Sequence, residues 1–239
     1  MKKLKSLTIF FPFFNDEGTV VHAISNAYRY GRMASKKLEV IAIHGGRSRD
    51  KTLDEIKKQK KKHPDLVIID KTNNWERYAV IKYGFQKAKG EWIFYTDGDL
   101  QYSLRDLQKL IIKQQKTHVD VVNGYRKQRS DSALRIIGGA VYRKLTKLIF
   151  KLPIDDLECD FRLIRRAALL KIKFESHNAS ILLELIKKLE LNGAGFSEVL
   201  VNHYTRRYGY STYGLMSLLK EKLLGDIKVW YSLKKMYKI

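Results

Sequence analysis

The residues with the clearest chemical potential are two aspartates separated by one glycine. Asp97 and Asp99 directly follow an apolar run at residues 92–96, which reads as a buried strand. Residues two apart in an extended segment point their side chains to the same side. Two converging carboxylates repel each other unless a cation neutralises them, and hard oxygen ligands favour Mg²⁺ or Mn²⁺. The sequence therefore predicts a divalent-metal site at Asp97 and Asp99, with Gln101 as a further oxygen donor.

A divalent ion at this position could bridge a diphosphate and stabilise it as a leaving group. Gly98, between the two carboxylates, would let a ligand approach the backbone closely. The alternative is that Asp-Gly-Asp is only a turn, because such tripeptides are common in loops. Its position directly after a buried strand favours the metal site, since ligands of open α/β sheets bind beyond the carboxyl ends of the strands.

The elements that must position these carboxylates alternate along the first half of the chain. Strands are predicted at residues 7–11, 38–43, 66–69 and 91–96. Helices are predicted at 17–30, 51–62 and 76–89, and Gly31 is expected to end the first of them. Such alternation predicts an α/β fold with a mostly parallel central sheet that helices cover on both faces.

The second half continues this pattern to residue 212. Helices are predicted from Ser103 onward and at 133–150 and 179–191, and strands at 119–123, 161–164 and 196–204, with a basic loop at 126–135. The helix at 133–150 is expected to turn one apolar face inward, formed by Ile137, Val141, Leu145 and Leu148. Residues 1–212 are therefore expected to form one catalytic domain.

Residues 213–239 differ in character from the rest of the chain. They carry six lysines against two acidic residues. An apolar stripe at helical spacing runs through Leu215, Leu219, Leu223, Ile227, Trp230, Leu233 and Tyr237. This composition suits an amphipathic helix in a membrane interface. It equally suits a C-terminal helix docked on the domain, because a stripe alone does not say whether lipid or protein covers it.

The charge and cysteine content limit the possible partners. With 47 Lys and Arg against 25 Asp and Glu, the net charge is +22. This surplus fits nucleic acid, an anionic membrane surface or phosphorylated small molecules. The single cysteine, Cys159, excludes a disulfide within the chain and a cysteine-rich zinc site. The apolar run at 7–14 reads as a strand rather than a secretion signal, and apolar stretches stay short of the roughly 20 residues that span a bilayer.

Five segments in order along the chain resemble glycosyltransferase family 2. They are similar to its branch of dolichol-phosphate mannose synthases and polyprenyl-phosphate glycosyltransferases. The segments are residues 11–17 (FPFFNDE), 95–102 (YTDGDLQY), 123–126 (NGYR), 156–166 (DLECDFRLIRR) and 206–211 (RRYGYS). Each motif is short, but their ordered combination over residues 7–211 is specific.

The resemblance implies an A-type glycosyltransferase fold, with a Rossmann-like sheet, and an inverting transfer. The donor would be a nucleotide-diphosphate sugar, the cofactor Mg²⁺ or Mn²⁺, and the acceptor a polyprenyl phosphate. The protein would then lie in the cytoplasm as a peripheral protein on the inner face of the membrane. Because one amphipathic helix binds a membrane reversibly, a membrane-spanning partner protein is expected to support stable attachment.

The resemblance also assigns roles to individual residues. Metal ligands would be Asp97, Asp99 and Gln101. Phosphate contacts would come from Arg126, Arg135 and Arg206, whose guanidinium groups match phosphate oxygens. Further substrate contacts would come from Pro12, Asn15, Glu17, Ser48, Asp50 and Ser211. Asp156 is the candidate for an acceptor-side or base role, and its alternative is a loop carboxylate paired with a nearby basic residue.

The nucleotide segment departs from the family pattern. Gly45 and Gly46 stand where the family has an acidic pair, although Ser48, Asp50 and Thr52 match. Glu76 likewise replaces a family glycine. Three interpretations stay open: an unusual donor, recognition of the base by main-chain atoms, or weakened activity.

Two other functions compete with transfer to a lipid phosphate. The first is a family 2 transferase acting on a soluble or cell-surface glycan, for which Asp156 would serve as a base. The second is a basic nucleic-acid-binding protein without catalysis, because tyrosines and arginines interleave at 204–213. Helix-turn-helix, zinc-finger and aromatic RNA-binding signatures are absent from the sequence, so a nucleic-acid partner is not expected.

Overall fold

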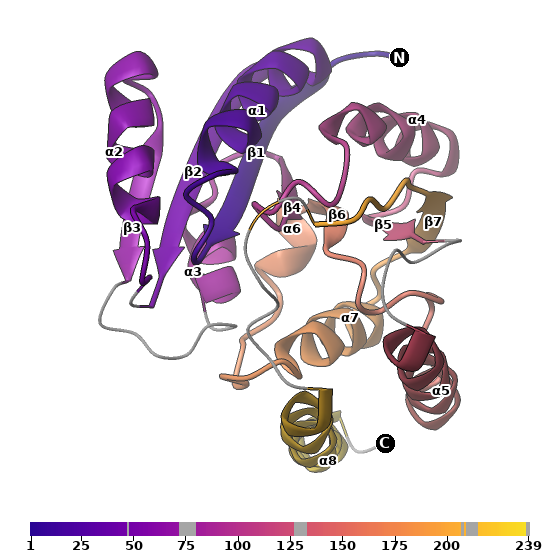
Figure 1. Ribbon diagram of the computed structural model, residues 1–239. Helices are drawn as coiled ribbons and strands as arrows, with labels where there is room; N and C mark the ends of the chain where they lie inside the picture. Colours follow the sequence, from indigo (N-terminus) through magenta and orange to yellow (C-terminus); the bar gives the residue numbers. More distant parts are fainter. Residues whose placement is uncertain (47, 72–79, 127–132, 207, 209–214, 238–239) are drawn as a thin grey trace.

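The computed structural model describes residues 1–46, 48–71, 80–126, 133–206, 208 and 215–237. Its centre is a seven-stranded sheet with the strand order β3-β2-β1-β4-β6-β5-β7 (Figure 1). The strands are β1 (Leu4–Phe13), β2 (Ser35–Gly45), β3 (Val67–Lys71), β4 (Trp92–Thr96), β5 (Val121–Tyr125), β6 (Phe161–Arg165) and β7 (Phe196–Leu200). Their apolar, β-branched and aromatic content explains why they pair within a buried sheet.

Helices cover both faces of this sheet (Figure 1). One face carries α1 (Val20–Ala34), α2 (Thr52–Lys62) and, after the 3₁₀ turn η2 (Leu104–Asp106), α4 (Leu107–Thr117). The other carries α3 (Val80–Lys87), α5 (Ala133–Phe150), α6 (Arg166–Leu169), α7 (Ile181–Leu191) and α8 (Leu215–Tyr237). The expected α/β class with helices on both faces is confirmed.

The strand directions determine where side chains can meet. Strands β1, β2, β3 and β4 are mutually parallel, so their carboxyl ends lie at one edge of the sheet. β6 runs antiparallel to β4, and Thr96 at the end of β4 pairs with Phe161 at the start of β6. The residues that follow β4 and those that precede β6 therefore meet at this edge, although about 60 residues of chain separate them.

The first helix does not end at Gly31, as the sequence had indicated, but continues to Ala34. A Cβ atom at Gly31 would lie 2.6 Å from Cδ1 of Leu38 on β2. The glycine therefore permits close packing of the helix on the sheet, and it does not act as a helix stop. The strand expected at 196–204 also ends earlier, at Leu200, and His203 then makes a single bridge to Tyr102.

The inward face predicted for α5 is wrong. Val141, Leu145 and Leu148 are 54%, 49% and 75% exposed, while Tyr142, Thr146 and Phe150 are buried. The side chain of Ile137 lies outside the described part of the helix. Tyr142 and Thr146 use their hydroxyl groups in buried hydrogen bonds, so the partly polar face can pack inward.

The apolar stripe of α8 is divided between two environments. Leu233 is buried, whereas Leu223, Ile227 and Trp230 are exposed. The buried face of α8 also contains Lys222 and Asp226, which pair with groups of the domain. The helix is therefore docked on the domain through one face and exposes apolar side chains on another. The division into residues 1–212 and 213–239 stays a prediction.

Across the described helices, none combines the length and apolar character that a bilayer crossing requires.

Candidate active site

A cavity of about 120 Å³ lies at the carboxyl edge of the parallel strands. Both aspartates of the predicted metal site line it. The described residues around it are Pro12, Phe13, Phe14, Asp16, Gly45, Val80, Ile81, Asp97, Asp99, Asp160 and Arg206. The two carboxylates thus share one hollow at the position where open α/β sheets bind ligands.

The turn after β4 holds Asp99 in a defined orientation. Its Oδ1 accepts a hydrogen bond from the backbone N–H of Gln101 at 3.0 Å. Its Oδ2 accepts one from Nη2 of Arg206 at 2.6 Å. Leu100 adopts a φ of +60°, an uncommon conformation for a residue other than glycine. A Cβ atom at Gly98 would lie 2.2 Å from the ring of Phe13. Glycine is therefore needed between the aspartates for β1 and this turn to pack together.

The donor set fits a divalent ion that shares its coordination with a substrate. Among the described residues, no group of three or more His, Cys, Asp or Glu side chains could enclose a metal ion. Mg²⁺ is usually held by one or two carboxylates plus substrate phosphates and water, and Asp97 and Asp99 would supply the two carboxylates. Each carboxylate oxygen retains acceptor capacity beyond one hydrogen bond. The side-chain amide of Gln101, the third predicted ligand, donates to the carbonyl of Tyr204 at 3.1 Å.

The predicted nucleotide-contacting residues form two interlocked turns. Pro12 lines the cavity. The Asn15 N–H donates to Ser48 Oγ at 3.2 Å, and the Glu17 N–H donates to Asp50 Oδ2 at 3.1 Å. These hydrogen bonds join the turn after β1 to the turn after β2. Asn15, Glu17, Ser48 and Asp50 are thus brought together, but they are not among the described residues that line the cavity. Their role as substrate contacts stays a prediction.

The two glycines that replace the family's acidic pair have separate structural reasons. Gly46 has a φ of +76°, which favours glycine over residues with a Cβ atom. At Gly45, a Cβ atom would lie 2.7 Å from Cγ1 of Val80. Val80 also lines the cavity. Val80 therefore occupies space that a carboxylate at position 45 would need.

His44 lies beneath these turns and is nearly completely buried. Its Nδ1 lies 3.2 Å from Oδ1 of Asp70, and its Nε2 lies 3.0 Å from Oγ of Ser48. Both ring nitrogens therefore engage the protein, and His44 braces Ser48 against the end of β3.

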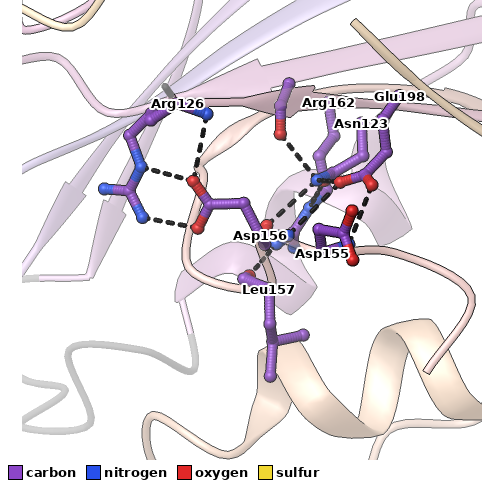
Figure 2. A network of polar contacts seen from close by, with 8 residues as sticks. Asn123, Arg126, Asp155, Asp156, Leu157, Arg162 and Glu198 are labelled. Atoms are coloured by element: carbon purple, nitrogen blue, oxygen red, sulfur yellow. Dashed lines mark hydrogen bonds and ion pairs between the residues drawn. The ribbon is translucent and has the colours of Figure 1, made fainter. Parts of the chain in front are cut away.

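Residues 155–160, which we call the acidic loop, carry four carboxylates, of which that of Asp160 lines the cavity. Asp156 is buried. Its carboxylate accepts two hydrogen bonds from Arg126 in a bidentate ion pair, from Nε to Oδ2 and from Nη2 to Oδ1, each 2.7 Å long (Figure 2). Burial raises the pKa of Asp156, but hydrogen bonds and positive charge from Arg126 outweigh it and hold the pKa below its ordinary value. The backbone N–H groups of Asp155 and Asp156 donate to Glu198 on β7.

This geometry bears on two predicted roles. Arg126 is buried and its guanidinium is already paired, so a phosphate would have to compete with Asp156. Asp156 itself matches the alternative named for it, a loop carboxylate paired with a basic residue. Its lowered pKa makes it a weak base.

Asp160 is a cavity residue that the sequence analysis missed. Its Oδ1 accepts a hydrogen bond from the hydroxyl of Tyr95 at 2.9 Å. That hydroxyl in turn accepts a hydrogen bond from Nη1 of Arg162 at 2.8 Å. Burial is the largest influence on its pKa and raises it above the ordinary value, while the charge of Arg162 opposes this. The available signal was local: Asp160 belongs to the segment at 156–166 that resembles the family.

A fully buried arginine forms the framework beneath this side of the cavity. Arg162 donates to Asn123 on β5 and to the carbonyl of Leu157 in the acidic loop (Figure 2). It also donates to the hydroxyl of Tyr95 on β4. One guanidinium therefore links the loop to two strands of the sheet.

Two further predicted residues cannot be placed. The side chain of Arg135 and all of Ser211 lie outside the described residues. Arg206 is the third predicted phosphate contact, and it lines the cavity beside Asp99.

A larger cavity of about 370 Å³ lies away from these strand ends, beside α7 and α8. Its most buried charges, Glu184 and Lys188, pair with each other at 2.6 Å. The Glu184 carboxylate also accepts the N–H groups of Glu175 and Ser176. Because these charges already serve the protein's own structure, the smaller cavity at the strand edge is the better candidate for phosphate chemistry.

Comparison with known proteins decides the family of this fold and site. The sequence profile of glycosyl transferase family 2 matches residues 8–173. The chain belongs to glycosyltransferase family 2. This match includes Asp97, Asp99 and the whole acidic loop, so the family expected from the motifs is confirmed.

A curated relative agrees with this membership. The undecaprenyl-phosphate 4-deoxy-4-formamido-L-arabinose transferase of Shewanella sediminis is 28% identical over 218 residues, which are 89% of this chain and 63% of the relative. The chain thus spans less than two thirds of the length of this curated relative.

Solved structures of glycosyltransferases share the fold. Mannosyl-3-phosphoglycerate synthase from Rubrobacter xylanophilus superposes with a TM-score of 0.70 at 14% identity and covers 99% of this chain and 76% of that one. Glucosyl-3-phosphoglycerate synthase from Mycobacterium tuberculosis, solved with Mn²⁺, UDP and its product, gives a TM-score of 0.65 at 13% identity, with 94% and 80% covered. The expected A-type glycosyltransferase fold of this family 2 chain is therefore confirmed.

Proposed function

We propose that this chain transfers a sugar, with inversion, from a nucleoside-diphosphate sugar to a polyprenyl phosphate, assisted by Mg²⁺ or Mn²⁺. One observation carries the proposal: Asp97 and Asp99 line a single cavity at the carboxyl edge of the parallel strands. Family membership and the name of the Shewanella relative support the reaction class and the lipid acceptor. The Mn²⁺ and UDP in the mycobacterial synthase support the metal and the donor class.

The roles follow from the positions of the side chains. Asp97 and Asp99 would hold the ion, which would supply positive charge to the departing diphosphate. Arg206, whose guanidinium lies 2.6 Å from Asp99, is placed to donate to the same phosphate oxygens. Pro12 and Gly45 form the wall beside the interlocked turns, where we place the nucleoside.

The acceptor side needs little base chemistry. A phosphate acceptor is already anionic at neutral pH and attacks without prior loss of a proton. This agrees with Asp156, which is committed to Arg126 in a buried ion pair. The acidic loop would then shape the acceptor side of the cavity through Asp160.

We further propose that α5 and α8 rest on an anionic membrane surface. Exposed apolar side chains on these two helices are Val141, Leu145, Leu148, Ile149, Leu223, Leu224, Ile227, Trp230, Tyr231 and Met236. Exposed lysines accompany them, including Lys144, Lys228, Lys234 and Lys235. An apolar face with lysines around it suits the interface of an anionic bilayer. The inner face of the cell membrane presents such a surface to a cytoplasmic protein, and a membrane-spanning partner remains part of the proposal.

A transfer to a glycan hydroxyl is the second candidate, and Asp160 is the observation that favours it. This carboxylate lines the cavity, and burial raises its pKa, so it could take a proton from a hydroxyl acceptor.

One experiment separates the candidates. The protein is incubated with radiolabelled nucleotide sugars, Mn²⁺ or Mg²⁺, and either a short polyprenyl phosphate or a soluble glycan. The proposal expects label in the organic phase after lipid extraction, and none with Asp99→Ala. Label that stays in the aqueous glycan would favour the second candidate. Absence of transfer from every donor tested would contradict both.

A further inference from the structure

The two helices that carry the exposed apolar faces both contact the acidic loop. Nζ of Lys222 on α8 forms an ion pair with Oε1 of Glu158. Nζ of Lys147 on α5 forms an ion pair with Oδ1 of Asp155. The loop beside the cavity is therefore attached to each outward-facing helix by a separate charge pair.

The exposed fractions of the side chains show which of these two ion pairs is the stronger connection. The side chains of Lys222 and Glu158 are 7% and 19% exposed, whereas those of Lys147 and Asp155 are 50% and 53% exposed. Exposed pairs exchange readily with water and contribute little. A buried pair is costly to break, because the remaining charge has no counter-ion. The Lys222–Glu158 pair is thus the firm connection between α8 and the loop.

Lys222 also belongs to a buried cluster that joins α5 to α8. Its Nζ lies 4.6 Å from the centre of the Tyr142 ring on α5. The Tyr142 hydroxyl donates to Oδ2 of Asp226, one turn further along α8, at 2.6 Å. These side-chain contacts link the two helices, and Lys222 is part of that link.

The far end of the acidic loop reaches the cavity. Glu158 is two residues from Asp160, which lines the cavity and accepts the Tyr95 hydroxyl. The intervening Cys159 is fully buried, and a Cβ atom at Gly124 would lie 2.8 Å from its sulfur. The packing around Cys159 is therefore close, which gives a short, densely packed connection between Glu158 and Asp160.

We propose that Lys222 is a positioning residue: through Glu158 it couples the seating of the α5–α8 surface on a membrane to the position of Asp160 in the cavity. This inference rests on the proposed transferase function and membrane face. It assigns the C-terminal helix a role in adjusting the acceptor side of the site, in addition to attachment.

The test uses the full-length chain with vesicles of phosphatidylcholine and phosphatidylglycerol. Wild type is compared with Lys222→Met, with the conservative Lys222→Arg and with Lys147→Met, which breaks the exposed pair to the same loop. Hydrogen exchange of residues 155–161 is followed with and without vesicles. Transfer to a short polyprenyl phosphate is measured under the same conditions. Circular dichroism and Mn²⁺-dependent binding of nucleoside diphosphate establish that each variant is folded with an intact donor site.

In wild type, vesicles should slow exchange in residues 155–161 and raise kcat. Lys222→Met should bind vesicles as wild type does, lose the protection, and show a kcat about tenfold lower with an unchanged KM for the donor. Lys222→Arg should recover most of the effect, and Lys147→Met should behave as wild type. Adding Glu158→Gln to Lys222→Met should lower kcat no further, because both changes break one contact.

Several results would overturn the inference. Vesicle-induced protection of residues 155–161 that persists in Lys222→Met would contradict it. Equal losses of protection and of kcat in Lys222→Met and Lys147→Met would contradict it as well. A wild type that binds vesicles without any change at residues 155–161 would also do so. The exchange readout does not depend on turnover. Failure of the proposed function, in which no sugar is transferred, is therefore distinguishable from failure of the coupling.

Discussion

At the scale of single residues, the Asp156–Arg126 pair distinguishes a structural carboxylate from one that lines the cavity. Both partners are buried, and Arg126 reaches both oxygens of Asp156. Asp160, four residues later, instead lines the cavity. Two aspartates of one loop thus have opposite environments, and their pKa values shift in opposite directions.

We predict that Asp156→Asn lowers the free energy of unfolding by about 3 to 5 kcal/mol at pH 7, because Arg126 then remains as a buried cation without a counter-ion. The carboxylate has a pKa below its ordinary 3.8 in the folded state. Its stabilisation is therefore complete above that pH and is lost as the pH falls through the folded value. The difference between wild type and variant should shrink in acid, as denaturant titrations at several pH values would show.

The matched control for this change is Asp155→Asn in the same loop. Its partner Lys147 and its own side chain are both about half exposed, so a loss below about 1 kcal/mol is expected. An Asp156→Asn protein of unchanged stability that nevertheless lost transfer would point instead to a direct chemical role for Asp156.

At the scale of elements, the end of β2 and the start of α3 fit together through Gly45 and Val80. We predict that Gly45→Ala costs about 1 to 3 kcal/mol of stability and weakens nucleotide binding, because its Cβ atom would meet Val80 at 2.7 Å. Val80→Ala in the same chain should restore much of both. Thermal melting and nucleotide titration measure the two effects.

Gly195→Ala provides the control, because its nearest contact is a looser 3.3 Å to Val119. If Gly45→Ala melted and bound nucleotide as wild type does, packing against Val80 would not explain the absence of an acidic residue at position 45.

The order and type of the elements could be predicted from the sequence, because alternating apolar runs and helical periodicity are local signals. The aspartate pair was found for the same reason, since it directly follows a strand. Asp160 was missed because its place in the cavity depends on the pairing of Thr96 with Phe161, a contact between distant segments. Gly31 was misread because its closeness to Leu38 is likewise a tertiary contact.

The faces of α5 and α8 show a second limit of periodicity. A stripe of leucines identifies an apolar face but not the material that covers it. Here Val141, Leu145 and Leu148 point outward, while polar groups such as Tyr142 and Asp226 satisfy each other inside. The pattern of hydrogen-bond partners decided the orientation, and it is not visible in a single sequence.

At the scale of the whole molecule, the net charge of +22 and the two apolar helix faces predict binding to anionic membranes. Leu148→Gln and Leu224→Gln should each weaken vesicle binding about tenfold, since each removes a side chain that would enter the lipid interface. The binding should also fall as salt is added. Co-sedimentation with vesicles that contain phosphatidylglycerol measures both effects.

Ile112→Gln is the control, because Ile112 is 40% exposed on α4, which covers the opposite face of the sheet. Equal losses for all three variants would contradict a membrane face on α5 and α8. Unchanged binding of all three would indicate that a protein partner, rather than lipid, covers these helices.

The central claim, that Asp97 and Asp99 hold a cation which in turn binds a diphosphate, is tested most directly by calorimetric titration of UDP and GDP with and without Mn²⁺. Wild type should bind at least one of them far more tightly with Mn²⁺ than in EDTA. Asp97→Asn and Asp99→Asn should lose about tenfold or more of that gain, while Asp120→Asn, at the opposite edge of the sheet before β5, should keep it. Nucleotide binding that ignores Mn²⁺ in wild type, or that survives unchanged in both variants, would contradict the account.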